Sequence, residues 1–394
     1  MHLHEYQAKH LLSRFGIPVP MGQVVASPAE GAAAARQLGC PRLAIKAQIL
    51  AGERMAAGGV AFARSPEEAS TTAARMLGQR LETVQSRPGG SVVSQILVEE
   101  AIDSVQDLYA AVAVDGVSGT IVALASAVGG EGIEARARQT PGLMRRCIVD
   151  IVGGKPVADF EGLAAEVIAS PGLQSALAGI LKSLAAALLA FDARLIEINP
   201  LAVTANGRLV ALDAKITLDA NALQRHPELA TMRAANEKAS TDAAELEAQR
   251  HNINFITLDG NVGVAVNGAG LALATLDMMV DAGIRPANFM DIRTTASSLD
   301  IAHGFKLLLD DPRVKVLLVN IHGGGMQRCD TVAEGLGIAL RKSTRSIPII
   351  TRMAGNNAAF AATVLDNNGV RHIATDDMAE AVRLLGETTR KEAA

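Results

Sequence analysis

A chain of 394 residues exceeds the usual size of one hydrophobic core, so we expect two or three domains. Apolar residues make up 49% and charged residues 20%, a balance typical of a globular protein and not of a disordered one. The net charge of -4, with both signs mixed along the chain, gives no basic stripe and argues against nucleic acid or an anionic membrane as a partner.

The N-terminal segment MHLHEYQAKHLL has no apolar signal-peptide core, and we expect no run to approach the roughly 20 apolar residues of a membrane span. We therefore expect a cytoplasmic protein. Cys40, Cys147 and Cys329 are far apart and form no metal-binding spacing, so we expect neither a zinc site made of cysteines nor a disulfide framework.

From the start of the chain to about residue 235, short β-like runs alternate with Ala-rich helical stretches. Asp115-Gly116 and Asn206-Gly207 each lie between two such runs and predict tight hairpins. Strands and helices mixed in this way favour an α+β layer fold over a strictly parallel sheet. The expected strands are Leu43–Ile49, Gln95–Glu99, Leu108–Val114, Thr120–Ser126, Arg194–Ile198 and Leu209–Leu212, and the expected helices are Ala32–Leu38, Pro66–Leu77 and Leu173–Ala190.

The stretch from Asn236 to His251 is charged and has no β-like run, so it predicts a connecting helix or linker. We place the domain boundary there, with a first domain over residues 1–240 and a second over residues 241–394.

After this boundary five β-like runs alternate regularly with helical stretches, which predicts a doubly wound parallel sheet. The expected strands are Val262–Val266, Ala287–Ile292, Val314–Asn320, Ile347–Thr351 and Val370–Ala374, and the expected helices are Leu271–Ala282, Ala302–Leu308, Val332–Lys342, Ala358–Leu365 and Met378–Leu384.

Gly-rich turns follow three of these strands, at His322–Gly325, Asn267–Gly270 and Gly355–Asn357. Free backbone N–H groups and the positive end of a helix dipole would stabilise a phosphate or carboxylate at such a turn. The glycines of a single turn of this kind often only allow the chain to reverse direction tightly between a strand and a helix. Three at the carboxyl edge of one sheet favour a binding site.

The first domain carries polar side chains in otherwise apolar strands. Lys46 lies within LAIKAQIL, where a phosphate would be a suitable partner, although a lysine reaching out to solvent fits equally well. Asn199 lies near a strand end and Asp213 follows the next strand, a pair of oxygen ligands suited to Mg²⁺. The alternative is that these are surface polar residues beside Pro200.

The chain resembles, from end to end, the β subunit of succinyl-CoA synthetase and its relative malate-CoA ligase. The matching stretches are LHEYQAK at Leu3–Lys9, GIPVP at Gly16–Pro20, IEINPL at Ile196–Leu201, NGAGLA at Asn267–Ala272, PANF at Pro286–Phe289, VNI at Val319–Ile321, RCD at Arg328–Asp330 and GNNA at Gly355–Ala358.

The resemblance implies an α/β protein with an N-terminal ATP-grasp fold, followed by a flavodoxin-like doubly wound parallel sheet. It implies a ligase of the tricarboxylic acid cycle type, which converts NTP, a carboxylate and CoA to NDP, phosphate and acyl-CoA. It also implies Mg²⁺ as cofactor and a heteromeric partner, the α subunit, which binds CoA and carries a histidine that is transiently phosphorylated. The assembly would be αβ or (αβ)₂, and the nucleotide ATP or GTP, with Pro20 similar to the ATP-preferring members.

By position, the resemblance assigns roles to residues in both domains. Glu197 would stabilise the phosphohistidine, Asn199 and Asp213 would bind the metal, and Asn267 would contact the organic acid together with a turn of the second domain. The predicted nucleotide contacts are Lys46, Glu53, Arg54, Met55, Glu99, Ile102 and Asp107, and the turn consists of Gly324, Gly325, Met326 and Gln327.

Three departures from the family pattern affect these sites. The Gly-rich phosphate cover GGRGKAGG reads GERMAAGG at Gly52–Gly59, which removes two glycines and a lysine and adds an acid. FLDVGGGA reads FMDIRTTA at Phe289–Ala296, and one residue is added between Asn320 and Asp330. Since Arg293 offers bidentate recognition of a carboxylate or sulfonate, we expect a dicarboxylate or sulfo acid other than succinate.

Two other functions fit parts of this pattern. A degenerate β-like subunit would bind an α-type partner without transferring phosphate, which the altered cover favours and the retained Lys46, Glu197, Asn199 and Asp213 oppose. An ATP-grasp ligase that acts without a phosphohistidine is disfavoured by the paired anion turns of the second domain.

Overall fold

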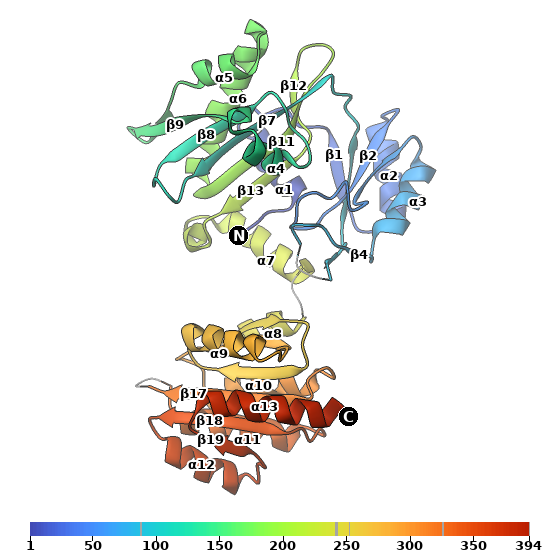
Figure 1. The fold of residues 1–394 in the computed structure, drawn as a ribbon. Coiled ribbons are helices and arrows are strands. Elements are labelled where there is room, and N and C mark those ends of the chain that lie inside the picture. The colour runs from blue at the N-terminus through green and yellow to red at the C-terminus, as the bar shows by residue number, and fades with distance from the viewer. Residues whose placement is uncertain (87–88, 241–242, 252, 325–326, 394) are drawn as a thin grey trace. The chain divides into compact units, whose positions relative to one another are not determined.

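The computed structural model describes residues 1–394 except 87–88, 241–242, 252, 325–326 and 394, and it divides into two compact units, Met1–Ser240 and Thr241–Ala394 (Figure 1). Each unit has its own sheets and its own hydrophobic core.

The first unit contains a small antiparallel sheet covered by two helices. Its strand order is β1 (Gly22–Val25), β6 (Ile96–Glu100), β2 (Leu43–Ala47) and β3 (Val60–Ala63), and the helices are α2 (Pro28–Leu38) and α3 (Pro66–Met76). Both helices begin in the same way. Ser27 and Ser65 cap them by accepting a hydrogen bond from a backbone N–H, and proline follows as the first helical residue. A short ladder, β4 (Arg80–Leu81) with β5 (Ser91–Val92), lies outside this sheet.

The larger sheet of the first unit is also antiparallel throughout. Its order is β10 (Lys155–Val157), β9 (Arg145–Val152), β8 (Ile121–Ser126), β7 (Gln106–Val114), β11 (Ala193–Val203) and β12 (Leu209–Ala211), and β13 (Ala214–Leu218) also pairs with β11. The hairpins predicted at Asp115-Gly116 and Asn206-Gly207 join β7 to β8 and β11 to β12, which confirms the α+β prediction. The helices of this part are α1 (Glu5–Ser13), α4 (Ile133–Gln139), α5 (Phe160–Val167), α6 (Pro171–Ala190) and α7 (Pro227–Ser240).

Helix α6 corrects one expectation from the sequence. It has 20 residues and, by length and composition, is a candidate membrane span, so the expectation that no apolar run approaches this length is wrong. In the structure Leu177, Leu181, Leu184 and Leu188 are buried in the main core of this unit, together with residues of the large sheet. The spacing of these four leucines is that of one face of a core helix.

The second unit is a six-stranded sheet in the order β14 (Ile253–Thr257), β16 (Asn288–Ile292), β15 (Val262–Val266), β17 (Val316–Gly323), β18 (Ile349–Gly355) and β19 (Ile373–Thr375). The last five run parallel and follow the flavodoxin-like order 2-1-3-4-5, so the predicted doubly wound sheet is confirmed. Strand β14 is antiparallel to β16 and was not predicted. An antiparallel strand at the edge of a parallel sheet is common, but this one is short and only partly buried.

Helices cover both faces of this sheet, as the side chains of β17 show. Leu317, Val319 and Ile321 pack in one core with α10 (Ser298–Asp310), α11 (Cys329–Lys342) and α12 (Ala358–Asn367). Val316 and Leu318 pack in a second core with α9 (Ala269–Asp281) and α13 (Met378–Ala393). The continuous apolar run of β17 follows from this burial on two sides. Helix α8 (Ala243–Arg250) precedes the sheet, and with α7 it accounts for the charged segment predicted at the boundary.

Candidate functional site

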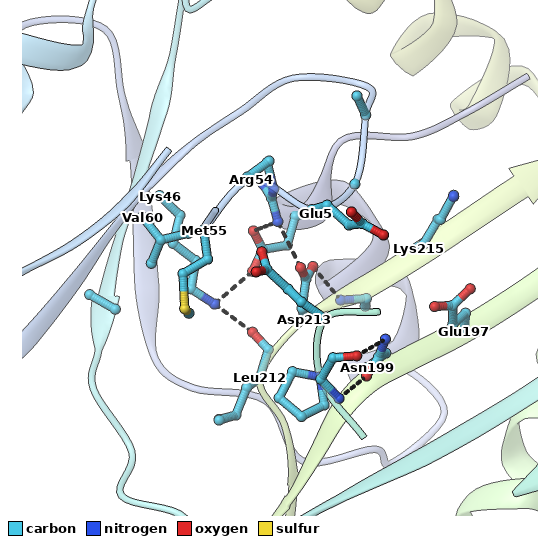
Figure 2. Close-up of a pocket in the computed structure, with 18 of the residues that line it drawn as sticks. Glu5, Lys46, Arg54, Met55, Val60, Glu197, Asn199, Leu212, Asp213 and Lys215 are labelled. Atoms are coloured by element: carbon cyan, nitrogen blue, oxygen red, sulfur yellow. Dashed lines mark hydrogen bonds and ion pairs between the residues drawn. The ribbon is translucent and has the colours of Figure 1, made fainter. Parts of the chain in front are cut away.

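A cavity of about 410 Å³ in the first unit brings together all the nucleotide, metal and catalytic residues that the sequence predicted in the first domain. Figure 2 shows several of them, among them Lys46, Arg54, Glu197, Asn199 and Asp213. Strand β2 supplies Lys46, β6 supplies Glu99 and β11 supplies Glu197 and Asn199, so both antiparallel sheets contribute. Asp213 directly precedes β13, and the loop between β2 and β3 supplies Glu53, Arg54 and Met55. Ile102 and Asp107 complete the set.

Lys46 lies in a buried cluster of charges and does not reach out to solvent. Its Nζ donates to Glu5 Oε1 at 3.0 Å and to the Leu212 carbonyl at 2.6 Å, and it lies 2.7 Å from Glu99 Oε1. Lys9 Nζ is within 2.7 Å of the same two carboxylates. Burial alone would lower the pKa of Lys46, but Glu5, Glu99 and Asp213 raise it above its usual value, so this amine is charged.

Arg54 closes the cluster from the loop side. Its Nη2 donates to Glu5 Oε2 at 2.5 Å and to Asp213 Oδ2 at 2.9 Å, and its Nη1 donates to the Ala47 carbonyl at 2.9 Å. Burial alone would raise the pKa of Glu5. Arg54, Lys46 and Lys9 instead hold it well below its usual range. The loop is held further at Ala56, whose backbone N–H donates to Glu131 at 3.0 Å.

The charges of this cluster balance, with three cations (Lys9, Lys46 and Arg54) against three carboxylates (Glu5, Glu99 and Asp213). A polyphosphate that enters the cavity must therefore exchange places with some of these carboxylates. Lys215 is a further cation of the cavity. Among the described residues its ammonium donates only to Gln85 Oε1, at 3.4 Å, so it is available to an incoming anion.

Asn199 and Asp213 offer the hard oxygen donors that Mg²⁺ prefers. Asn199 Oδ1 accepts from the Gly130 backbone N–H at 2.6 Å, which fixes the orientation of the amide. Asp213 Oδ1 accepts from the Ala214 N–H, and its Oδ2 accepts from Arg54. This donor set fits Mg²⁺, and these two residues could hold the ion; in this structure Asp213 Oδ2 accepts from Arg54.

Glu197 is the half-buried acid of the cavity. Burial raises its pKa to about 7; Lys215, which faces it across the β11–β13 ladder, opposes this rise, while Glu134 and Asp213 add to it. A carboxyl group with this pKa can accept and release a proton near neutral pH. Tyr109, which is buried, has its pKa raised by burial and by Glu197 and Glu134, so its hydroxyl stays protonated.

In the second unit the predicted turns lie at the carboxyl edge of the parallel sheet. Asn267 follows β15 and is held by the end of β17: its Nδ2 donates to the His322 carbonyl and its Oδ1 accepts from the His322 N–H, both at 2.8 Å. Gly324 donates its N–H to the Gln327 carbonyl at 3.0 Å. Gln327 is buried, and its Oε1 has no hydrogen-bond partner among the described residues. Gly325 and Met326 lie outside the described residues.

Arg293 lies at the same edge, just after β16, but its partner is on the strand that the sequence did not predict. Its Nε and Nη2 donate to Asn254 Oδ1 at 3.1 and 2.8 Å, and Asn254 Nδ2 donates to Asp291 Oδ2 at 3.0 Å. Asp291 Oδ1 in turn accepts from the Gly268 N–H at 2.6 Å, where α9 begins. Arg293 is thus held by β14, and among the described residues its Nη1 has no hydrogen-bond partner.

Several residues of the cavity were not singled out from the sequence, namely Glu5, Glu131, Glu134 and Lys215, and neither was Lys9, which contacts Glu5 and Glu99 in the charge cluster. Glu5 and Lys9 are four residues apart on α1 and lie inside the LHEYQAK stretch, which carried their only signal. Lys215 pairs directly with Glu197 on the neighbouring strand, a relation that exists only once the sheet is formed.

Comparison with known proteins identifies both parts of the chain. The family model of an ATP-grasp domain matches residues 2–203, and that of a CoA-ligase matches residues 265–385. The β subunit of ADP-forming succinate–CoA ligase from Chlorobium limicola is 44% identical, over 97% of this chain and 97% of that protein. The same subunit from Paraburkholderia xenovorans is 41% identical, over 97% of each.

Among solved structures, ATP citrate lyase from Methanothrix soehngenii, in complex with citrate and coenzyme A, matches with a TM-score of 0.72. It covers 98% of this chain and 99% of that chain at 19% sequence identity, so it supports the fold and no more.

Proposed function

This chain belongs to the family of succinate–CoA ligase β subunits, and on that premise we propose that its first unit binds ATP with Mg²⁺ and passes a phosphate to a histidine of an α subunit. It is the β subunit of an NDP-forming acid–CoA ligase, and its partner is the corresponding α subunit. The observation that carries the proposal is the single cavity that joins Lys46 and Arg54 to Glu197, Asn199 and Asp213.

In this proposal Lys46, Arg54 and Lys215 hold the phosphates of the nucleotide. Arg54 leaves Asp213 and turns to the phosphates, because a phosphate offers the same bidentate partner as the carboxylate that it gives up. Asn199 and Asp213 would hold Mg²⁺, which supplies charge neutralisation between the phosphate oxygens. Glu197 accepts a proton from the incoming imidazole and leaves the opposite nitrogen free to attack, a role that suits its pKa of about 7.

The organic acid would bind at the carboxyl edge of the second unit, shared with the α subunit. The positive end of the α11 dipole, at the same edge as Asn267 and Gly324, favours an anion there, first a phosphate and then the acyl phosphate. The relatives are succinate–CoA ligases, and the Arg293 guanidinium adds a charged donor that favours a related dicarboxylate or sulfo acid, so we propose succinate or one of these acids as the substrate class. The complex would be a cytoplasmic αβ or (αβ)₂ assembly with CoA bound mainly by the α subunit.

The test is co-expression of this chain with its α-type partner and measurement of CoA-dependent ADP formation. The acids to compare are succinate, malate, itaconate, 3-sulfinopropionate and sulfoacetate, each with ATP and with GTP. Turnover that requires both chains, CoA and one of these acids would support the proposal and name the acid. A stable complex that binds no nucleotide in calorimetry would instead identify a degenerate subunit.

A further inference from the structure

A second cluster of ligand-type side chains lies in the second unit, on two helices that pack together. Glu247 and His251 are on α8 and at its end, one turn apart, and His303 is on α10. One ligand atom from each of these three residues lies within 4.8 Å of the other two. None of the three belongs to the cavity of the first unit or to the turns around Asn267 and Gly324.

The distances within the cluster are close to those of a metal site. Glu247 Oε1 and His251 Nε2 are 3.3 Å apart, which is about the separation of two ligands on a tetrahedral ion with bonds of about 2.0 to 2.1 Å. The His303 ring stacks on the His251 ring with centroids 3.7 Å apart and planes 7° apart. Because His303 is exposed, its ring is free to tilt and direct a nitrogen toward the same point.

An additional carboxylate holds the histidine in the orientation that binding requires. His251 Nδ1 lies 3.3 Å from Asp300 Oδ1. Asp300 Oδ2 in turn accepts from the backbone N–H of Ser297 at 3.0 Å and from its hydroxyl at 2.7 Å, as part of the capping box that begins α10. A proton on Nδ1, held by Asp300, leaves the lone pair of Nε2 on the side of Glu247. A carboxylate behind a metal-binding histidine is the usual arrangement around protein-bound zinc.

We propose that Glu247, His251 and His303 form a binding site for one divalent transition-metal ion of the Zn²⁺ class, positioned by Asp300 and joining α8 to α10. Two imidazoles and one carboxylate suit Zn²⁺, Ni²⁺ or Co²⁺ and not Mg²⁺, which prefers oxygen donors alone. Three protein ligands leave a position for water. We assign the ion a structural role, because it would link α8, the first helix of the second unit, to α10, which packs on one face of the sheet. This site is independent of the proposed ligase function.

The test uses the full chain, freed of metal by chelation and then titrated with ZnCl₂ in the presence of excess Mg²⁺. We expect one Zn²⁺ per chain in calorimetry and a melting temperature that rises by several degrees when the free metal is far above its dissociation constant. Co²⁺ added in place of Zn²⁺ should give the visible absorption bands of a four-coordinate ion with nitrogen and oxygen ligands.

His251→Gln and His303→Gln should each weaken Zn²⁺ binding by at least about tenfold. His372→Gln is the matched control, because His372 lies in the same unit and outside the cluster; it should bind like the parent chain. His303 is exposed, so its variant should fold even if His251→Gln does not. The proposal is overturned if the parent chain binds no Zn²⁺, if all three variants bind it equally, or if the metal leaves the melting temperature unchanged. In those cases His251 serves only as a hydrogen-bond partner of Glu247 and Asp300.

Discussion

Replacing Glu197 by glutamine should make this protein more stable while it removes activity. Burial raises the pKa of this carboxyl group from the ordinary 4.5 to about 7, so the fold resists its ionisation. Glutamine has nearly the same shape and carries no charge, so it removes this cost. The same substitution removes the group that we propose to accept the proton of the incoming histidine.

The size of the effect depends on pH, and its sign follows from proton linkage. A rise from 4.5 to about 7, at about 1.36 kcal/mol per pH unit, gives an upper limit of about 3 kcal/mol. Because the pKa is raised in the folded state, the contribution of the Glu197 carboxyl group to the stability of the parent chain is fully present below pH 4.5. It is lost as the pH rises through 7. The glutamine variant lacks this loss, so the two proteins should be about equal near pH 4.5 and should differ most near pH 8.

The assay is urea denaturation of both chains between pH 5 and pH 8, with Glu166→Gln as the control. Glu166 is an exposed acid of the same unit, so its variant should stay within about 0.5 kcal/mol of the parent at every pH. The reasoning fails if Glu197→Gln destabilises the chain at pH 8, or if its effect does not change with pH. The ligase activity of Glu197→Gln in the complex with the α subunit should be lost, although the variant is more stable. Full activity would refute the role given to Glu197.

Three further predictions concern other parts of the two sites. Glu5→Gln leaves Lys46 and Arg54 short of a buried partner and should cost about 3 to 5 kcal/mol in urea denaturation; a cost below about 1 kcal/mol would contradict the cluster. Glu53 has a φ of 56°, so Glu53→Gly should relieve about 1 kcal/mol of backbone strain. It also removes a negative charge beside the proposed phosphate site, so it should tighten nucleotide binding in calorimetry; weaker binding would exclude a repulsive role for Glu53. Arg293→Ala should raise the KM for the acid by about ten- to a hundredfold and leave the KM for the nucleotide unchanged. The control is Arg371→Ala, at an exposed arginine of the same unit, which should leave both KM values unchanged; an unaltered KM for the acid in Arg293→Ala would remove Arg293 from the substrate site.

The regular parts of the fold were predictable because their residue patterns are local. The second unit reads as five alternating strands and helices, and the structure has them in the expected sequence. Strand β14 was not predicted because Ile253–Thr257 is a short, half-exposed edge strand between a charged helix and a turn. Its pairing with β16 stabilises the extended conformation, which its own residue pattern does not indicate. Helix α6 shows the converse, since its composition alone cannot distinguish a membrane span from a core helix.

The candidate site was predictable only in part, for a related reason. Lys46, Asn199 and Asp213 stood out as polar residues beside apolar strands, and the cavity contains all three. Their partners did not stand out. Glu5 on α1 contacts Lys46 and Arg54 across 41 and 49 residues of chain, and no local pattern indicates such a contact.

The sequence by itself determined the two-part organisation, the parallel sheet of the second unit and the residue types of each site, because strand and helix periodicity, turn residues and motifs are properties of short segments. Only the tertiary structure decided which charges neutralise one another. The balance of three cations and three carboxylates, the contact of Arg54 with Asp213, the raised pKa of Glu197 and the meeting of Glu247, His251 and His303 all depend on distances between segments that are far apart or on separate elements. Electrostatic energy depends on those distances and on burial, and neither is fixed until the chain has folded.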